Sequence, residues 1–123
     1  MTNRAAARQK AYSLGKRAEW MAALLLMLKG YRVVARRYPA PVGEIDLIVR
    51  RGRQLVFVEV KARATLEDAA HSIRPSQQAR IVRGAEAFLS RHPHFVGYDM
   101  RFDAVLVAPR RRPRHLEAAF SSF

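Results

Sequence analysis

A two-residue turn signal, Gly52-Arg53, lies in the middle of an apolar-rich stretch that spans residues 43–63. A two-residue hairpin loop of type II′ needs glycine at its first central position, so this pair predicts a β-hairpin. The turn also fixes the pairing of the two strands, in which Asp46 lies opposite Glu59. Since side chains alternate along a strand, one face of the hairpin is expected to be apolar and buried. That face comprises Ile45, Leu47, Val49, Val56, Val58 and Val60.

The other face of the hairpin is charged at the end far from the turn. Like charges that oppose each other weaken a sheet, so Asp46 and Glu59 require a cation between them. Opposed side chains have Cβ atoms about 5 Å apart, and Mg²⁺ prefers a few carboxylate oxygens together with waters and phosphate. Lys61, on the same face, could position or activate a water or offset phosphate charge. The alternative is a charged surface hairpin in which Glu44 pairs with Lys61.

The composition limits the classes of protein to which the chain can belong. Its 123 residues are enough for one domain, residues 1–123, with a layered hydrophobic core. There is no cysteine, which excludes disulfides, thiol nucleophiles and cysteine-ligated zinc and is compatible with a cytoplasmic location. The net charge of +13 predicts a polyanionic partner. Nucleic acid is the commonest such partner, and an anionic membrane or an acidic protein are the alternatives.

The remaining pattern predicts elements on both sides of the hairpin. A frayed basic arm precedes them, and a mobile loop follows the hairpin. The apolar run of the first helix is far shorter than the ~18 residues that span a bilayer, so no transmembrane helix is predicted. A signal peptide is the rival interpretation, but Glu19 interrupts the run and no small-residue cleavage site follows. The expected ranges are arm 1–10, helix 12–28, strand 31–38, loop 65–74, helix 75–91, strand 100–107 and a helical turn at 115–120.

Polar residues outside the hairpin are further candidates. Glu19 is the only acid of the first helix, and its simpler interpretation is a solvated or lysine-paired residue. Gln78 extends the apolar stripe of the second helix, so it could point at the sheet. The N–H groups at the start of that helix, with Arg80 nearby, could receive a phosphate, although an exposed first turn is the simpler interpretation. Asp103 beside Arg101 is expected to form an ion pair.

The hairpin motif resembles the core of the YraN-like family of uncharacterised bacterial proteins. The resemblance rests on Gly43–Asp46 (GEID), Phe57–Lys61 (FVEVK) and Arg63, and weaker matches extend it over nearly the whole chain. That family belongs to the PD-(D/E)xK nuclease superfamily and is similar to archaeal Holliday-junction resolvases. The resemblance implies an α/β fold with a restriction-endonuclease-like (tRNA-endonuclease-like) three-layer core. In such a core, a mixed central sheet of about four strands is flanked by helices.

The resemblance also implies roles for individual residues. Asp46 and Glu59 become the metal-binding acids, Lys61 the catalytic lysine, and Glu19 the first-helix acid of resolvase-like members. The backbone carbonyl of Val60 becomes a further metal ligand. The implied ion is Mg²⁺, for which Mn²⁺ could substitute. Two residues depart from the family pattern. Ala18 stands where the family often has glycine, and Gln77 stands where it often has lysine.

The function expected from the resemblance is that of a metal-dependent endonuclease. It would hydrolyse phosphodiester bonds in DNA, favoured over RNA, including branched or structured DNA, and resolvase-like relatives suggest a homodimer. The alternative is a non-catalytic nucleic-acid-binding protein that retains the nuclease fold. Contacts to the phosphate backbone are expected from the basic surface and one amide side chain. These residues are Arg36, Arg37, Arg63, Gln78 and Arg80.

Overall fold

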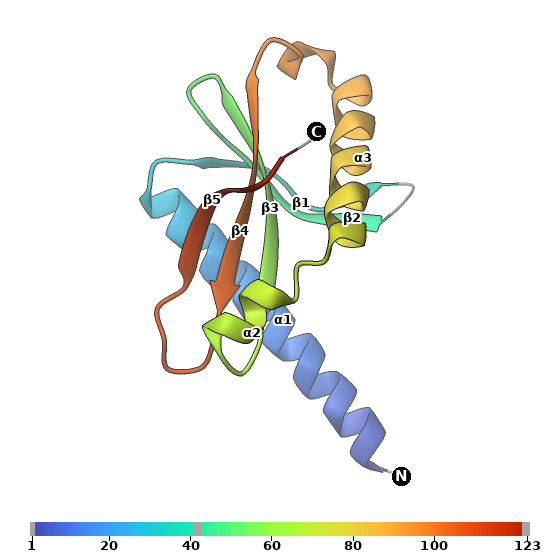
Figure 1. Cartoon of the computed structure of the whole chain (residues 1–123), viewed down its shortest axis with the longest axis vertical. Coiled ribbons are helices and arrows are strands. Elements are labelled where there is room, and N and C mark those ends of the chain that lie inside the picture. Colours follow the sequence, from blue (N-terminus) through green and yellow to red (C-terminus); the bar gives the residue numbers. More distant parts are fainter. Residues whose placement is uncertain (1, 41–42, 122–123) are drawn as a thin grey trace.

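Five strands form the sheet at the centre of the structure: β1 (Arg32–Ala40), β2 (Gly43–Arg51), β3 (Gln54–Ala62), β4 (Asp99–Val107) and β5 (Arg114–Phe120). The computed structural model describes residues 2–40 and 43–121. The strands lie side by side in sequence order, and every neighbouring pair is antiparallel except β3 and β4, which run parallel (Figure 1). The sheet is therefore mixed, as predicted, and has one strand more than expected.

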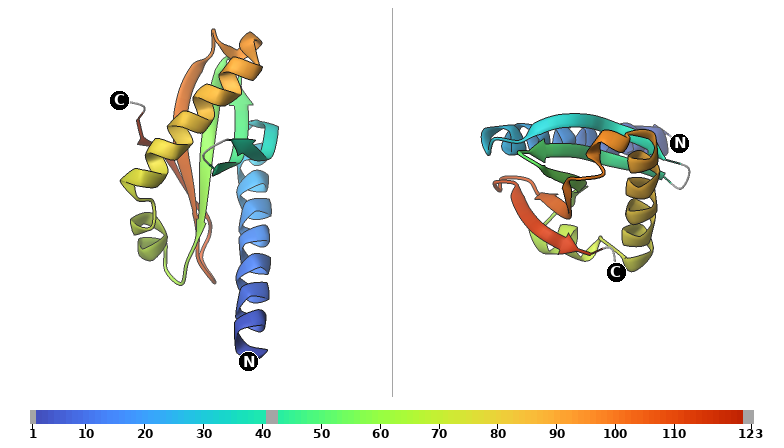
Figure 2. Two further views of the ribbon diagram at one scale, coloured as in Figure 1. Left: turned by 90° about the vertical axis from the view of Figure 1, so that its right-hand side faces the viewer. Right: turned by 90° about the horizontal axis from the view of Figure 1, so that it is seen from above.

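Helices cover both faces of this sheet. They are α1 (Thr2–Leu28), α2 (Leu66–His71), α3 (Pro75–Arg91) and the short 3₁₀ helix η1 (Pro93–Phe95). Figure 2 shows α1 on one face of the sheet, with α2 and α3 on the other. Leu26 of α1 packs with Val56 in one buried cluster, and Phe88 of α3 packs with Phe57 in another. This three-layer arrangement is consistent with a restriction-endonuclease-like core.

The hairpin of β2 and β3 has the predicted register near its turn. Gly52 has a φ of +61°, a conformation that glycine adopts without a steric penalty. Pairing then runs regularly from Arg51–Gln54 to Leu47–Val58. The predicted apolar face is wrong at Ile45, which packs on the α3 side of the sheet while Leu47 packs on the α1 side.

The first helix is longer than the sequence predicted. The arm 1–10 was expected to fray, yet the chain is helical from Thr2 onward, and Met1 lies outside the described residues. Residues 4–11 are alanine, arginine, glutamine and lysine, all of which favour helix, and no proline interrupts them. In Figure 2 the N-terminal turns of α1 extend past the end of the sheet. Among the described residues, no helix is long and apolar enough to cross a membrane.

Two further segments differ from the sequence prediction. The expected mobile loop 65–74 contains α2, whose first turn is capped by Thr65: the Thr65 hydroxyl accepts a hydrogen bond from the Asp68 N–H at 3.0 Å. The segment 115–120 forms part of strand β5 rather than a helical turn. It pairs with β4, which leaves β5 and β1 as the two edges of the sheet.

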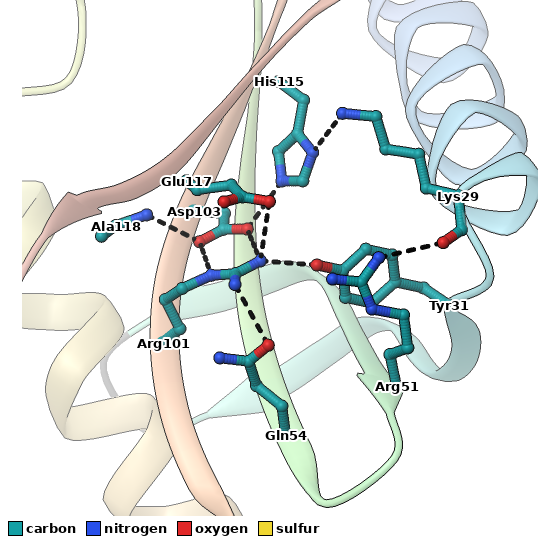
Figure 3. Close-up of polar contacts among 9 residues, drawn as sticks. All are labelled: Lys29, Tyr31, Arg51, Gln54, Arg101, Asp103, His115, Glu117 and Ala118. Carbon is teal, nitrogen blue, oxygen red and sulfur yellow. Dashed lines mark hydrogen bonds and ion pairs between the residues drawn. The ribbon is translucent and has the colours of Figure 1, made fainter.

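A buried carboxylate fastens β5 to the rest of the fold. Asp103 on β4 is fully buried, and Arg101 donates two hydrogen bonds to it, each 2.8 Å long (Figure 3). The Nε2 atom of His115 lies 2.6 Å from Asp103 Oδ2, and the Ala118 N–H donates to Oδ1 at 3.0 Å. Burial alone would raise the pKa of Asp103, but these hydrogen bonds hold it below its ordinary value. The predicted ion pair with Arg101 is thus part of a larger network.

The same network reaches the end of α1 and the start of β3. The Lys29 Nζ atom lies 2.9 Å from His115 Nδ1. Because an ammonium group can only donate, His115 accepts at Nδ1 and donates from Nε2 to Asp103. Arg101 donates in addition to the hydroxyl of Tyr31 at 2.6 Å and to Gln54 at 3.1 Å. Strands β3, β4 and β5 and the turn that follows α1 are therefore linked around one carboxylate.

Candidate active site

The candidate site lies where β2 separates from β3. Their regular pairing ends at Leu47–Val58, and the carboxylate of Asp46 then takes the place of the neighbouring backbone. The Val60 N–H donates to Asp46 Oδ2 at 2.8 Å. Since the N–H and C=O of one strand residue point toward the same neighbouring strand, the Val60 carbonyl also faces this gap. Separation of the strands thus directs one backbone carbonyl into the gap beside one carboxylate.

Strand β1 is irregular at the same level. Arg37 lies between the pairs Arg36–Leu47 and Tyr38–Ile45, and its φ is +48°. A positive φ is unfavourable for a residue with a Cβ atom, so the surrounding structure must hold Arg37 in it. The deviations of β1 and β2 together turn Ile45 to the α3 side of the sheet. They also allow Asp46 to approach β3.

Two carboxyl groups meet in the gap. Glu59 is buried, and its carboxyl lies within hydrogen-bonding reach of Asp46. Burial raises the pKa of Asp46 to about 8, and the charge of Glu59, its hydrogen bond with Asp46 and, less strongly, the charge of Glu19 act in the same direction. Only the hydrogen bond from Val60 opposes them. Two carboxyl groups in this position need a shared proton or a cation.

A lysine lies beside this pair, as the sequence spacing predicted. Lys61 is buried except for 8 % of its surface, and its Nζ atom lies 3.3 Å from Glu59 Oε1. Lys61 therefore pairs with Glu59 rather than with Glu44, which is exposed. The ammonium group is held in place next to the carboxylates, where it can also meet an anion.

Helix α1 supplies the third acid. Glu19 accepts a hydrogen bond at Oε1 from Arg37 Nε, at 2.7 Å. Together with the pair of carboxyls and Lys61, it lines one pocket of about 330 Å³. We call this the acidic pocket. It is lined by Gly15, Ala18, Glu19, Asp46, Glu59, Val60, Lys61, Ala62 and Arg63.

The structure thus brings together every residue that was predicted to be catalytic or metal-binding. In residues 2–40 and 43–121 there is no group of three or more His, Cys, Asp or Glu side chains that could hold a metal by themselves. Mg²⁺ does not need such a group, because it retains several waters and binds through one or two carboxylates. Asp46, Glu59 and the carbonyl of Val60 are hard oxygen donors, and this donor set fits Mg²⁺ or Mn²⁺.

The residues predicted to contact phosphate are spread over three places. Arg63 lines the acidic pocket, whereas Arg80 lines a smaller pocket of about 90 Å³ on the α3 side, which Glu59 also lines. Arg37 is paired with Glu19, and the guanidinium of Arg36 lies 4.1 Å from the ring centre of Trp20. These arginines surround the site without converging on one point.

The prediction for Gln78 is not supported by the geometry. Its side-chain amide donates to the Ile73 carbonyl at 3.5 Å, and it lines neither of these pockets. Its neighbour Gln77 lines the smaller pocket instead, and the buried Gln77 Oε1 atom has no hydrogen-bond partner among the residues that the structure describes. The sequence contains a pattern that places Gln77 on the buried face of α3, because residue 77 lies one helical turn before the buried Ile81.

Comparison with known proteins identifies the family. The family model described as "Uncharacterised protein family UPF0102" matches residues 18–107, which include the acidic pair and its lysine. A UPF0102 protein of Parvibaculum lavamentivorans is 60 % identical over 110 residues, which cover 89 % of this chain and 83 % of that protein. One of Methylorubrum extorquens (strain PA1) is 58 % identical over 115 residues, covering 94 % and 90 % of the two chains. One of Rhodopseudomonas palustris (strain BisB18) is 54 % identical over 115 residues, covering 94 % and 85 %. The resemblance to the YraN-like family is thereby confirmed, and the chain belongs to the uncharacterised protein family UPF0102.

Proposed function

We propose that this protein is a Mg²⁺-dependent endonuclease of the PD-(D/E)xK type that hydrolyses phosphodiester bonds in DNA. The observation that carries the proposal is the meeting of two carboxyl groups, those of the buried Glu59 and the partly buried Asp46, with the backbone of Val60 and the ammonium of Lys61 in one pocket. Burying like charges side by side costs stability, and the ion pair of Lys61 with Glu59 offsets only part of that cost. A cation bound by the pair does offset it.

The metal would be held by Asp46, Glu59 and the carbonyl of Val60. The chemistry it supplies there is activation of a water nucleophile and neutralisation of charge on the phosphate. The ammonium of Lys61 is placed to stabilise the negative charge that develops on the phosphate during attack. The ion pair of Glu19 with Arg37 anchors α1 against β1 and keeps the wall of the pocket in position.

The surface of the protein supports a nucleic-acid substrate. Twenty-three basic residues against ten acidic ones give a charge of +13, although the candidate site itself is acidic. Lys and Arg contacts to phosphate provide most of the sequence-independent affinity for a nucleic acid. Arg63, at the edge of the acidic pocket, can hold the backbone next to the carboxylates. In this arrangement the basic surface binds the substrate and the acidic pocket cleaves it.

A cleavage panel tests the proposal. Labelled linear, flap and four-way-junction DNA is incubated with Mg²⁺, Mn²⁺ or EDTA. Asp46→Asn keeps an acceptor for the Val60 N–H but removes the charge, so we expect cleavage to fall ~100-fold or more while DNA binding is retained. Lys61→Ala should lower cleavage by a similar factor. The control is Glu86→Gln, an exposed acid of α3. Cleavage that survives Asp46→Asn, or that persists in EDTA, would refute the proposal.

The second candidate is a nucleic-acid-binding protein without cleavage activity. One observation favours it: the ion pairs Lys61–Glu59 and Arg37–Glu19 partly neutralise the acids within the protein itself. Isothermal titration calorimetry with Mg²⁺ or Mn²⁺ separates the two candidates. Uptake of metal by the wild type, lost in Asp46→Asn, supports the nuclease. DNA binding without any metal uptake supports the non-catalytic protein.

A further inference from the structure

A second pocket, of about 260 Å³, adjoins the acidic pocket. The two pockets share three lining residues, Ala18, Ala62 and Arg63. On its far side the second pocket is bounded by the chain that follows β4, from Val107 to Arg111. This chain lies at the same end of the sheet as the end of β3, because β3 and β4 are parallel and Ala62 pairs with Val107 (Figure 1).

The second pocket combines an apolar interior with a basic rim. Apolar side chains form its walls, among them Met21 of α1, which is 39 % exposed. Four arginines surround them: Arg17, Arg63, Arg110 and Arg111. None of the described residues that line this pocket is acidic, in contrast to the acidic pocket beside it. The backbone at Arg110 has a φ of +62°, so a sharp turn places this basic segment at the rim.

These two properties together indicate the class of ligand. Phosphate groups would satisfy the arginines but would gain nothing from apolar walls. A nucleobase has a flat apolar face that packs on side chains such as Met and on the plane of an Arg guanidinium. A base inside a duplex has both faces covered by its neighbours, so only an unpaired base can enter a pocket.

We propose that this second pocket binds an unpaired nucleobase of the substrate, next to the phosphate that lies in the acidic pocket. The proposal rests on the proposed nuclease function for the position of that phosphate. It adds the substrate class: DNA that carries an unpaired nucleotide beside the cleavage point, as flaps, forks and strained junctions do. Arg63, which lines both pockets, contacts the phosphate between the base and the cleavage site.

Two variants test the pocket, each with a matched control. Met21→Trp fills the pocket from the helix surface, and Met27→Trp places the same side chain on the exposed part of α1 outside it. Arg110→Ala removes one guanidinium from the rim, and Arg112→Ala removes the same charge from an exposed neighbour that does not line the pocket. Each variant is made in the wild type for cleavage and in Asp46→Asn for binding.

The binding probe is a flap oligonucleotide with 2-aminopurine as the unpaired base at the junction. On addition of the Asp46→Asn protein, stacking of this base should change its fluorescence. Met21→Trp and Arg110→Ala should weaken that binding about tenfold, and the two controls should leave the fluorescence change intact. A fully paired duplex with 2-aminopurine at the same position should show no such change.

Cleavage assays separate this proposal from the nuclease function. We expect Met21→Trp and Arg110→Ala to reduce cleavage of the flap about tenfold relative to each control. Equal cleavage of the flap by variants and controls would overturn the base pocket while leaving the nuclease intact. If no substrate is cleaved, the 2-aminopurine fluorescence measurement still tests whether the pocket binds a base, because it does not depend on catalysis. Absence of a fluorescence change with every unpaired probe would overturn the proposal.

Discussion

Replacement of Asp103 by alanine removes the centre of the network that joins β4 and β5 to α1. The wild-type carboxylate receives two hydrogen bonds from Arg101, one from His115 and one from the N–H of Ala118. The variant leaves the guanidinium of Arg101 largely buried, with its side chain only 16 % exposed. Removing one partner of a buried ion pair typically costs about 3–5 kcal/mol, because the remaining charge stays desolvated.

We therefore expect Asp103→Ala to lose about 3–5 kcal/mol of unfolding free energy at pH 7. The loss should lie toward the lower end, because Arg101 retains Tyr31 and Gln54 as hydrogen-bond acceptors and the carboxylate of Glu117 at 3.7 Å. In a domain of this size the loss corresponds to a fall in Tm of roughly 10–20 °C. The pH dependence has a definite sign. The pKa of Asp103 is lowered in the folded state, so its contribution is complete above the unfolded value of 3.8 and disappears as the pH falls through the folded value.

Urea unfolding followed by circular dichroism measures this loss. The control is Asp99→Ala, which removes an exposed acid at the start of the same strand and should change stability by less than about 0.5 kcal/mol. Wild type should lose stability below about pH 4, and the difference between wild type and Asp103→Ala should shrink there. A loss below about 1 kcal/mol at pH 7, or a loss that does not change with acidification, would refute the reasoning.

Two further predictions concern the site and the packing of α3. Asp46→Asn should stabilise the metal-free protein by about 1–3 kcal/mol at pH 8 and by much less at pH 4. The reason is that the pKa of Asp46 is raised from 3.8 to about 8 in the folded state, so the wild type loses unfolding free energy as the pH rises through this range, whereas the Asn variant does not. Mg²⁺ should raise the Tm of wild type only, so equal shifts in thermal melts of both proteins would contradict the assignment. Gly84→Ala would place a Cβ atom 3.0 Å from Ile45 Cδ1 and should cost about 1–3 kcal/mol in urea unfolding. Gly15→Ala, whose added Cβ atom meets no atom of the described residues within 4 Å, should stabilise α1 instead. A stabilising Gly84→Ala would show that α3 can shift.

The elements that the sequence predicted well are those with local signals. The turn at Gly52 determines the hairpin register, and the 3.6-residue spacing of apolar residues determines α3. The capping pattern Thr65–Asp68 is also local and could have predicted α2. Glu59 and Lys61 were selected as candidates for the same reason, because they alternate along one strand, whereas the regular pairing that was used to place Asp46 ends one residue before it.

The features that were missed depend on contacts between distant segments. Strand β5 is stabilised by pairing with β4 and by the hydrogen bond from Ala118 to Asp103, neither of which a short window reveals. The separation of β2 from β3 at Asp46 occurs at the same level as the irregularity of β1 at Arg37, and this is seen only when the three strands are assembled. At the start of α3, Gln77 rather than Gln78 lines the smaller pocket, and this is where the apolar stripe of the helix is least defined.

The parallel pairing of β3 with β4 also determines the order in which the fold can form. Each residue of β3 pairs with a residue 45 positions later, whereas β1, β2 and β3 are joined by short connections. Closing the long connection between β3 and β4 before their contacts form is slow. The antiparallel sheet of β1, β2 and β3 should therefore form first, and β4 should dock late. Until then the inner edge of β3 is unpaired and open to association with other chains. The strand that carries Glu59 and Lys61 is therefore open to misassembly until β4 has docked.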